Sequence, residues 1–180
     1  KSNKIDFDII RFTALAKSIT KPVGVINLKN YNIDFNGVRT IPIADSSMVQ
    51  FFPKNDSMKL GKNRDMEFSG MVLAARLDLH GDGHRFNYEG FKVELPRTDS
   101  MVINIPRGDG AYDEFNELIL VPMNSKIEKL EALVDIDHPA NKSGRSPLRQ
   151  FPMITSIKNS YVYYDQKRIL NGVYPRKSFY

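Results

Sequence analysis

The chain has 180 residues, enough for one full domain or two small ones. Apolar residues make up 41% and charged residues 26%, a balance typical of folded globular proteins. Its longest apolar run, residues 71–75, falls far short of the roughly 20 residues that a membrane-spanning helix needs. The absence of cysteine excludes disulfides, thiolate metal sites and cysteine nucleophiles.

The formal net charge is +5, which by itself would allow a nucleic-acid partner. Lysine and arginine are nevertheless scattered along the chain rather than gathered in one run. Only residues 145–177 are distinctly basic. We therefore expect a solvated surface with a mild excess of positive charge rather than a nucleic-acid site.

Residues 8–19 have helical spacing of apolar side chains and predict a short helix that ends before Pro22. Residues 23–28 and 38–43 predict strands, with a turn at Asn36 and Gly37 between them. A third strand over 48–52 ends at Pro53, and the polar residues 54–65 predict a loop.

The clearest strand signal is the alternation of apolar and polar residues over 66–105. We expect consecutive antiparallel strands there, each with one face on a core and the other in water. The Gly-Asp-Gly sequence at 81–83 predicts a hairpin turn, and Gly90 predicts a bulge.

After residue 105, two polar stretches at 106–116 and 138–152 predict long loops. Strands are expected at 118–121, around 154, at 161–164 and at 169–170, while 127–134 fits either a helix or a bent strand. The whole chain, 1–180, is thus predicted to be one mainly β module: an antiparallel β-sandwich or a stacked-strand domain with one or two short helices.

The sharpest cluster of chemically useful side chains is His80, Asp82 and His84. On an extended strand these three would share one face and could hold a divalent metal for hydrolysis. The glycines between them favour a tight turn that separates the side chains, so we predict a turn and no tightly bound metal.

Two other groups are weaker candidates. Asp135 and Asp137 could act as paired carboxylates, although a solvated strand edge has the same pattern. The tripeptide Arg107-Gly-Asp109 matches a sequence that integrin receptors read on loop tips, but it is also an ordinary turn. No cofactor motif or serine-nucleophile frame is present.

The aromatic and basic end of the chain predicts a contact surface, because tyrosine and arginine are enriched at interface hot spots. The same rings could instead pack inside the module. The residues predicted to bind are Tyr161, Tyr163, Tyr164, Arg168, Tyr174 and Arg176.

Two stretches carry a resemblance to a known group of proteins. One runs through Leu-Gly-Lys-Asn-Arg-Asp-Met-Glu-Phe-Ser-Gly at 60–70 to Phe-Asn-Tyr-Glu-Gly-Phe-Lys-Val-Glu-Leu at 86–95. The other includes Asp-His-Pro-Ala-Asn-Lys-Ser-Gly at 137–144, Tyr-Val-Tyr-Tyr-Asp at 161–165 and Asn-Gly-Val-Tyr-Pro-Arg-Lys-Ser-Phe-Tyr at 171–180. Together they cover about half of the chain and resemble segments of very large, poorly characterised extracytoplasmic proteins of the Bacteroidota.

The resemblance implies a β-rich segment of a longer exported chain, located in the periplasm, the outer membrane or at the cell surface. It brings no known active site. Ser57 and Ser100 stand in Asp-Ser-Met triplets that look like the O-glycosylation acceptor of that phylum, and Ser57 is the expected site because its surroundings are polar.

Three functions remain open from the sequence. The favoured one is a non-enzymatic structural or interaction module that contacts other envelope proteins or following domains of its own chain. The alternatives are a nucleic-acid-binding or coat-like β protein, and a metal-dependent hydrolase that uses His80, Asp82 and His84.

Overall fold

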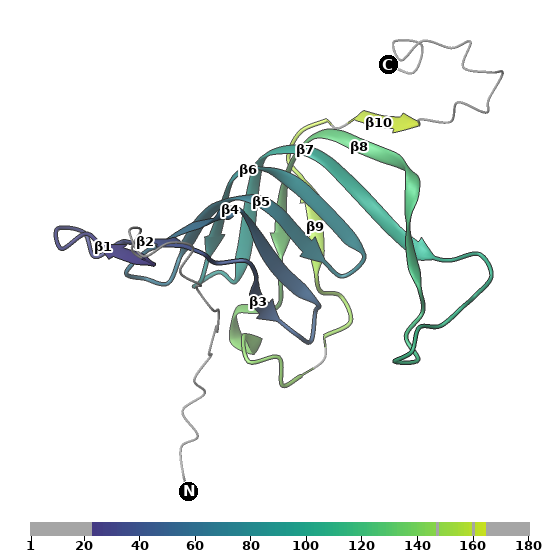
Figure 1. The fold of residues 1–180 in the computed structure, drawn as a ribbon, viewed down its shortest axis with the longest axis horizontal. Helices are drawn as coiled ribbons and strands as arrows, with labels where there is room; N and C mark the ends of the chain where they lie inside the picture. The colour runs from purple at the N-terminus through teal and green to yellow at the C-terminus, as the bar shows by residue number, and fades with distance from the viewer. Residues whose placement is uncertain (1–22, 147, 160, 165–180) are drawn as a thin grey trace, which may run out of the picture.

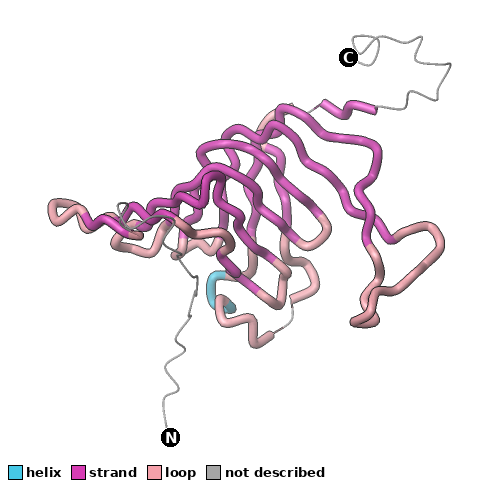
Figure 2. Tube along the Cα trace, viewed as in Figure 1, coloured by secondary structure: helices cyan, strands magenta, loops and turns pink. Residues whose placement is uncertain are grey.

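The computed structural model describes residues 23–146, 148–159 and 161–164, and strand is their main secondary structure, with turns and loops between the strands (Figures 1 and 2). The only helical segment in these ranges is a single turn of 3-10 helix, η1 (Pro139–Asn141). None of the described helical structure is long and apolar enough to cross a bilayer. The helix expected at 8–19 and the strand expected at 169–170 lie outside the described residues.

Ten strands form one open antiparallel sheet, so the predicted mainly β antiparallel fold is confirmed. They follow each other mostly as hairpins in the order β1-β2-β4-β5-β6-β7-β8-β10, with β3 beside β4 and β9 beside β8. Their bounds are β1 Gly24–Ile26, β2 Ile33–Asn36, β3 Ile41–Ala44, β4 Val49–Leu60, β5 Met66–Ala74, β6 Leu77–Asn87, β7 Lys92–Pro106, β8 Leu120–Asp135, β9 Met153–Ser156 and β10 Tyr161–Tyr164.

The first strands differ from the prediction. Residues 36–37 do not connect two paired strands; β1 pairs instead with β2, which the sequence pattern missed. The chain then continues past Gly37, whose φ is +84°, so that β2 and β3 lie one after the other along the same edge of β4. The prediction of a loop at 54–65 is also wrong over its first half. Strand β4 extends to Leu60 through a bulge in which Asn55 and Asp56 have positive φ.

The hairpin turns of the central strands are placed differently too. Residues 81–83 lie inside β6, so the predicted Gly-Asp-Gly turn is wrong. The true turns are at 75–76 and 88–91, and Gly90 belongs to the second of them rather than to a bulge. Residues 127–134, which fitted a helix or a strand, belong to β8, which bends at Lys129 with a φ of +55°.

The sheet folds over along one line of paired residues that crosses five strands. This crease consists of Pro53, Gly70, Gly81, Thr98 and Leu130, each paired with the next across a strand boundary. Register shifts flank the line in every ladder, as expected where bulges bend strands. Glycine is needed at two of these positions, because a Cβ at Gly70 would stand 2.2 Å from the Phe52 carbonyl oxygen, and one at Gly81 would stand 2.0 Å from that of Arg97.

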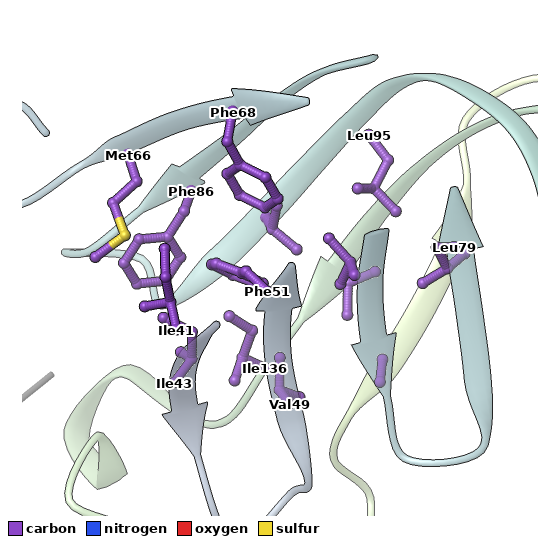
Figure 3. Packing of buried hydrophobic residues seen from close by; sticks show 14 of the residues in the cluster. Ile41, Ile43, Val49, Phe51, Met66, Phe68, Leu79, Phe86, Leu95 and Ile136 are labelled. Atoms are coloured by element: carbon purple, nitrogen blue, oxygen red, sulfur yellow. The ribbon is translucent and has the colours of Figure 1, made fainter. Parts of the chain in front are cut away.

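The hydrophobic core lies between the two halves of the folded sheet. Phe51, from one side of the crease, stacks on Phe68 from the other side with ring centroids 4.8 Å apart, and meets the edge of Phe86 at 5.6 Å (Figure 3). Phe51 is fully buried, and burying such a side chain contributes about 1.5–3 kcal/mol. The crease therefore lets one continuous sheet enclose its own core.

Candidate interaction surface

The structure does not bring His80, Asp82 and His84 together. The bulge at residues 82–83 turns His84 into the core, whereas His80 lies on the exposed face of β6. His84 is 0% exposed, its Nε2 is 3.1 Å from the Gly70 carbonyl oxygen, and its ring meets Phe68 edge-on at 5.3 Å. Burial lowers the pKa of His84, which favours a neutral ring that donates from Nε2. No group of three or more potential metal ligands occurs among the described residues.

The carboxylate of Asp137 holds a loop rather than facing a substrate. Asp137 is 3% exposed and accepts hydrogen bonds from the His138 amide and from Nδ2 of Asn141. Asn141 in turn donates to the Ser146 carbonyl and accepts from the Ser146 amide, which closes the loop after β8. Asp135 is half-buried at the end of β8, where it pairs with Lys92 across the ladder to β7.

A hollow of about 550 Å³ lies where the bulges of β7 and β8 meet. Its charged lining is balanced between three acidic and three basic residues, namely Arg97, Asp99, Glu128, Lys129, Glu131 and Lys158. Lys158 and Glu131 already form an ion pair of 2.5 Å there. This mixed lining selects no ligand charge, so the hollow is a weaker candidate than the surfaces described next.

The predicted aromatic contact region is only partly described. Tyr161, Tyr163 and Tyr164 belong to β10, whose backbone pairs with Ser125–Glu128 of β8. Arg168, Tyr174 and Arg176 lie outside the described residues, so binding by this region stays a prediction.

Ser57 and Ser100 differ in accessibility in the expected direction. Ser57 is exposed beside the β4 bulge, where its hydroxyl donates to Oδ1 of Asn36 at 3.3 Å. Ser100 is half-buried within β7, between His80 and Glu128 in the sheet.

Exposed large hydrophobic side chains gather on two projecting hairpins. Nine of the twelve such residues found in the described ranges lie there, at opposite ends of the long axis in Figure 1. We call residues 23–36 the N-terminal hairpin and residues 105–120, which join β7 to β8, the finger. The hairpin exposes Val25, Ile26, Leu28 and Tyr31, and the finger exposes Ile105, Tyr112, Phe115, Leu118 and Leu120.

The finger is held by its own hydrogen bonds. The Asp113 carboxylate accepts from the amides of Phe115 and Glu117, both at 2.9 Å. An isolated β-bridge pairs the backbones of Tyr112 and Leu118. The Asp113 amide donates a hydrogen bond of 2.8 Å to the Glu117 carbonyl, and these contacts hold the two sides of the finger close together at its tip. Phe115 is consequently displayed on a turn with fixed backbone geometry, although its side chain is 76% exposed.

The finger is also strongly acidic. Four carboxylates stand against one guanidinium, which gives residues 105–120 a formal charge of −3. Arg107 and Asp109 pair with each other at 2.8 and 2.9 Å, and this hydrogen bond raises the pKa of the arginine and lowers that of the aspartate. The two charged side chains of the Arg107-Gly-Asp109 tripeptide thus form an ion pair with each other.

The N-terminal hairpin has a similarly ordered turn. The Asn27 amide donates to the Asn32 carbonyl at 2.8 Å, and the side chains of Asn27 and Asn30 accept from nearby amides. Tyr31 has a φ of +60° and is 58% exposed, while Leu28 at the tip is 74% exposed. Its single lysine and single aspartate leave residues 23–36 formally neutral.

No family model, curated protein or solved structure matches this chain. The two hairpins therefore have to be interpreted from their own chemistry. The sequence pattern predicted a polar loop at 106–116, and within the two hairpins it named only Arg107-Gly-Asp109, as a weak candidate for receptor contact. The signal for an apolar contact surface there was the pair of rings, Tyr112 and Phe115, within an otherwise hydrophilic stretch.

Proposed function

We propose that this chain is a non-enzymatic interaction module of a larger exported or cell-envelope protein. It makes its contacts through the finger and the N-terminal hairpin. The observation that carries the proposal is the concentration of exposed large hydrophobic side chains on these two projections.

Folding gives no reason to display those side chains. An exposed apolar cluster promotes association, so folded proteins keep one mainly where a partner covers it. The finger also meets the usual requirements of an interface: central aromatic anchors, a polar rim and a preformed backbone that loses little entropy on binding.

The cellular context rests on the resemblance to Bacteroidota extracytoplasmic proteins. The expected partners are other envelope proteins or following domains of the same chain. The exposed Ser57 hydroxyl supports this context, because a glycan there would require no unfolding. An intact-mass measurement on native material tests the modification separately.

Neither alternative function gains support from the geometry. A hydrolase would need His80 and His84 on one face, and they lie on different faces. Nucleic acid would meet the exposed finger rings among four carboxylates, which repel phosphate.

Cell fractionation combined with site-specific photo-crosslinking tests the proposal. We expect the native protein outside the cytoplasm, and discrete crosslinked products from a photoreactive residue at position 115 or 28. Position 48 is the matched control, because Met48 is 57% exposed but lies on neither projection. A cytoplasmic location, or crosslinking at 115 and 28 no stronger than at 48, would refute the proposal.

A further inference from the structure

We infer that the crease is an acid-sensitive hinge, which the neutral side chain of His84 holds closed and which opens when that side chain takes up a proton. The inference does not depend on the proposed contacts of the finger and the N-terminal hairpin. It concerns the buried histidine of the chain, since His80 and His138 are exposed.

The side chain of His84 lies against the crease. Its Nε2 donates at 3.1 Å to the carbonyl of Gly70, which is one of the crease residues. Its ring meets the edge of Phe68, and Phe68 stacks on Phe51 from the other side of the crease (Figure 3). His84 therefore contacts both the backbone that bends and the aromatic stack that fills the bend.

The closed arrangement has no place for a proton on His84. With Nε2 as the donor, the neutral ring keeps a lone pair on Nδ1, and Nδ1 is buried without a hydrogen-bond partner among the described residues. Protonation converts that lone pair into a second N–H donor and places a positive charge in the core. A buried donor and a buried charge without partners are both unfavourable, so the closed state excludes the protonated ring.

The charges around His84 favour movement of a protonated ring out of the core. Asp82 on the same strand and Asp99 on β7 attract an imidazolium, and the exposed His80 opposes its charging. Asp99 is exposed and lines the hollow where the bulges of β7 and β8 meet. Two further charged residues of the neighbouring strands are also exposed, namely Glu67 of β5 and Arg97 of β7.

The backbone of the crease is suited to bending. Register shifts interrupt all four ladders that cross it. Residues with positive φ lie on the crease or close to it in four of its five strands: Asn55 and Asp56 in β4, Gly70 in β5, Gly83 in β6 and Lys129 in β8. Because regular pairing is already interrupted there, the crease can open while each half of the sheet stays paired.

The direction of the pH dependence follows from the two states. An exposed imidazole takes up a proton near about pH 6.5, whereas burial lowers the pKa of His84 in the closed state. The crease should therefore be closed above about pH 6.5. Below that value, the ratio of open to closed molecules should rise about tenfold per pH unit until the pKa of the closed state is reached.

A pair of spin labels tests the inference in the 180-residue chain. The chain has no cysteine of its own, so Glu67→Cys and Arg76→Cys supply the only two labelling sites. Both positions are exposed, and they lie on either side of Gly70. Double electron–electron resonance measures the distance between the labels over a pH series, and circular dichroism follows the strand content.

Two variants in the labelled chain separate His84 from other titrating groups. His84→Gln keeps a side-chain N–H donor for the Gly70 carbonyl but cannot take up a proton. His80→Gln is the matched control, because it removes an exposed histidine from the same strand. If His84→Gln does not fold at neutral pH, His84→Phe replaces it.

We expect a longer label distance to appear below about pH 6.5 in the labelled parent chain and in His80→Gln, reversibly and without loss of strand signal. His84→Gln should stay closed over the same range. An unchanged distance in the parent chain, equal opening in His84→Gln, or loss of the strand signal together with the opening would overturn the inference.

Discussion

Replacing Gly81 by alanine should destabilise the fold more than an ordinary Gly-to-Ala change in a strand. A Cβ at this position would lie 2.0 Å from the Arg97 carbonyl oxygen, and ordinary contact begins at 3.4 Å. Strand β7 must therefore move by at least about 1.4 Å at the crease. The φ of Gly81 is not in the left-handed region, so the penalty comes from space alone.

The expected cost follows from two contributions. Overpacking of a buried site costs about 1–3 kcal/mol. The displaced backbone also weakens the ladder where Gly81 faces Thr98 and Asp82 faces Arg97, and each lost hydrogen bond costs about 0.5–1.5 kcal/mol. We expect a total near 3 kcal/mol.

Urea unfolding followed by circular dichroism measures this difference. With a slope of about 2 kcal/mol/M, the midpoint should fall by about 1.5 M. Gly108→Ala is the matched control, because a Cβ there meets nothing within 4 Å, and it should change stability by less than about 0.5 kcal/mol. Equal midpoints for the two variants would show that the crease does not depend on close backbone approach.

Three further results are expected. His84 has a lowered pKa in the folded protein, so the unfolded chain binds protons more readily; stability should be complete above about pH 6.5 and fall as pH drops below it. The urea midpoint should differ less between pH 7.5 and pH 5.5 in His84→Phe than in the wild type. An equal difference in the two proteins would show that protonation of His84 does not cause the loss of stability. Asn141→Ala should lower the free energy of unfolding by about 1–3 kcal/mol, whereas the neighbouring exposed Ser143→Ala should not, and equal effects would refute the loop clamp. Phe115→Ala should leave the melting temperature within about 2 °C, since a large drop would place that ring in the core rather than on display.

The central strands were predictable because each buries one face and exposes the other. Met66, Phe68 and Val72 mark the inner face of β5 directly in the sequence. The turns were less predictable: Gly81 looks like a turn residue locally, but its real partner is the backbone of β7, which only the register reveals. The tight turn after β5 instead uses Ala75, at a φ of +54°, which has no turn signal of its own.

The candidate surface was hidden for a related reason. Periodicity distinguishes inward from outward residues within a regular strand, but Phe115 lies in a turn whose geometry depends on the Asp113 carboxylate. Its exposure is a property of the folded hairpin. The burial of His84 was likewise hidden in the sequence, because the bulge at 82–83 changes which side of the strand faces the core.

The consecutive pairing of β4 through β8 has a consequence for how the chain folds. Each of these strands joins the one just before it in sequence, so the sheet can grow by adding one hairpin at a time. Sandwiches built from strands distant in sequence must close long loops first, and this slows them. Here the two faces of the core meet through bending of a sheet already in register. Folding should therefore be faster than is usual for an all-β chain of this length, with the crease formed last.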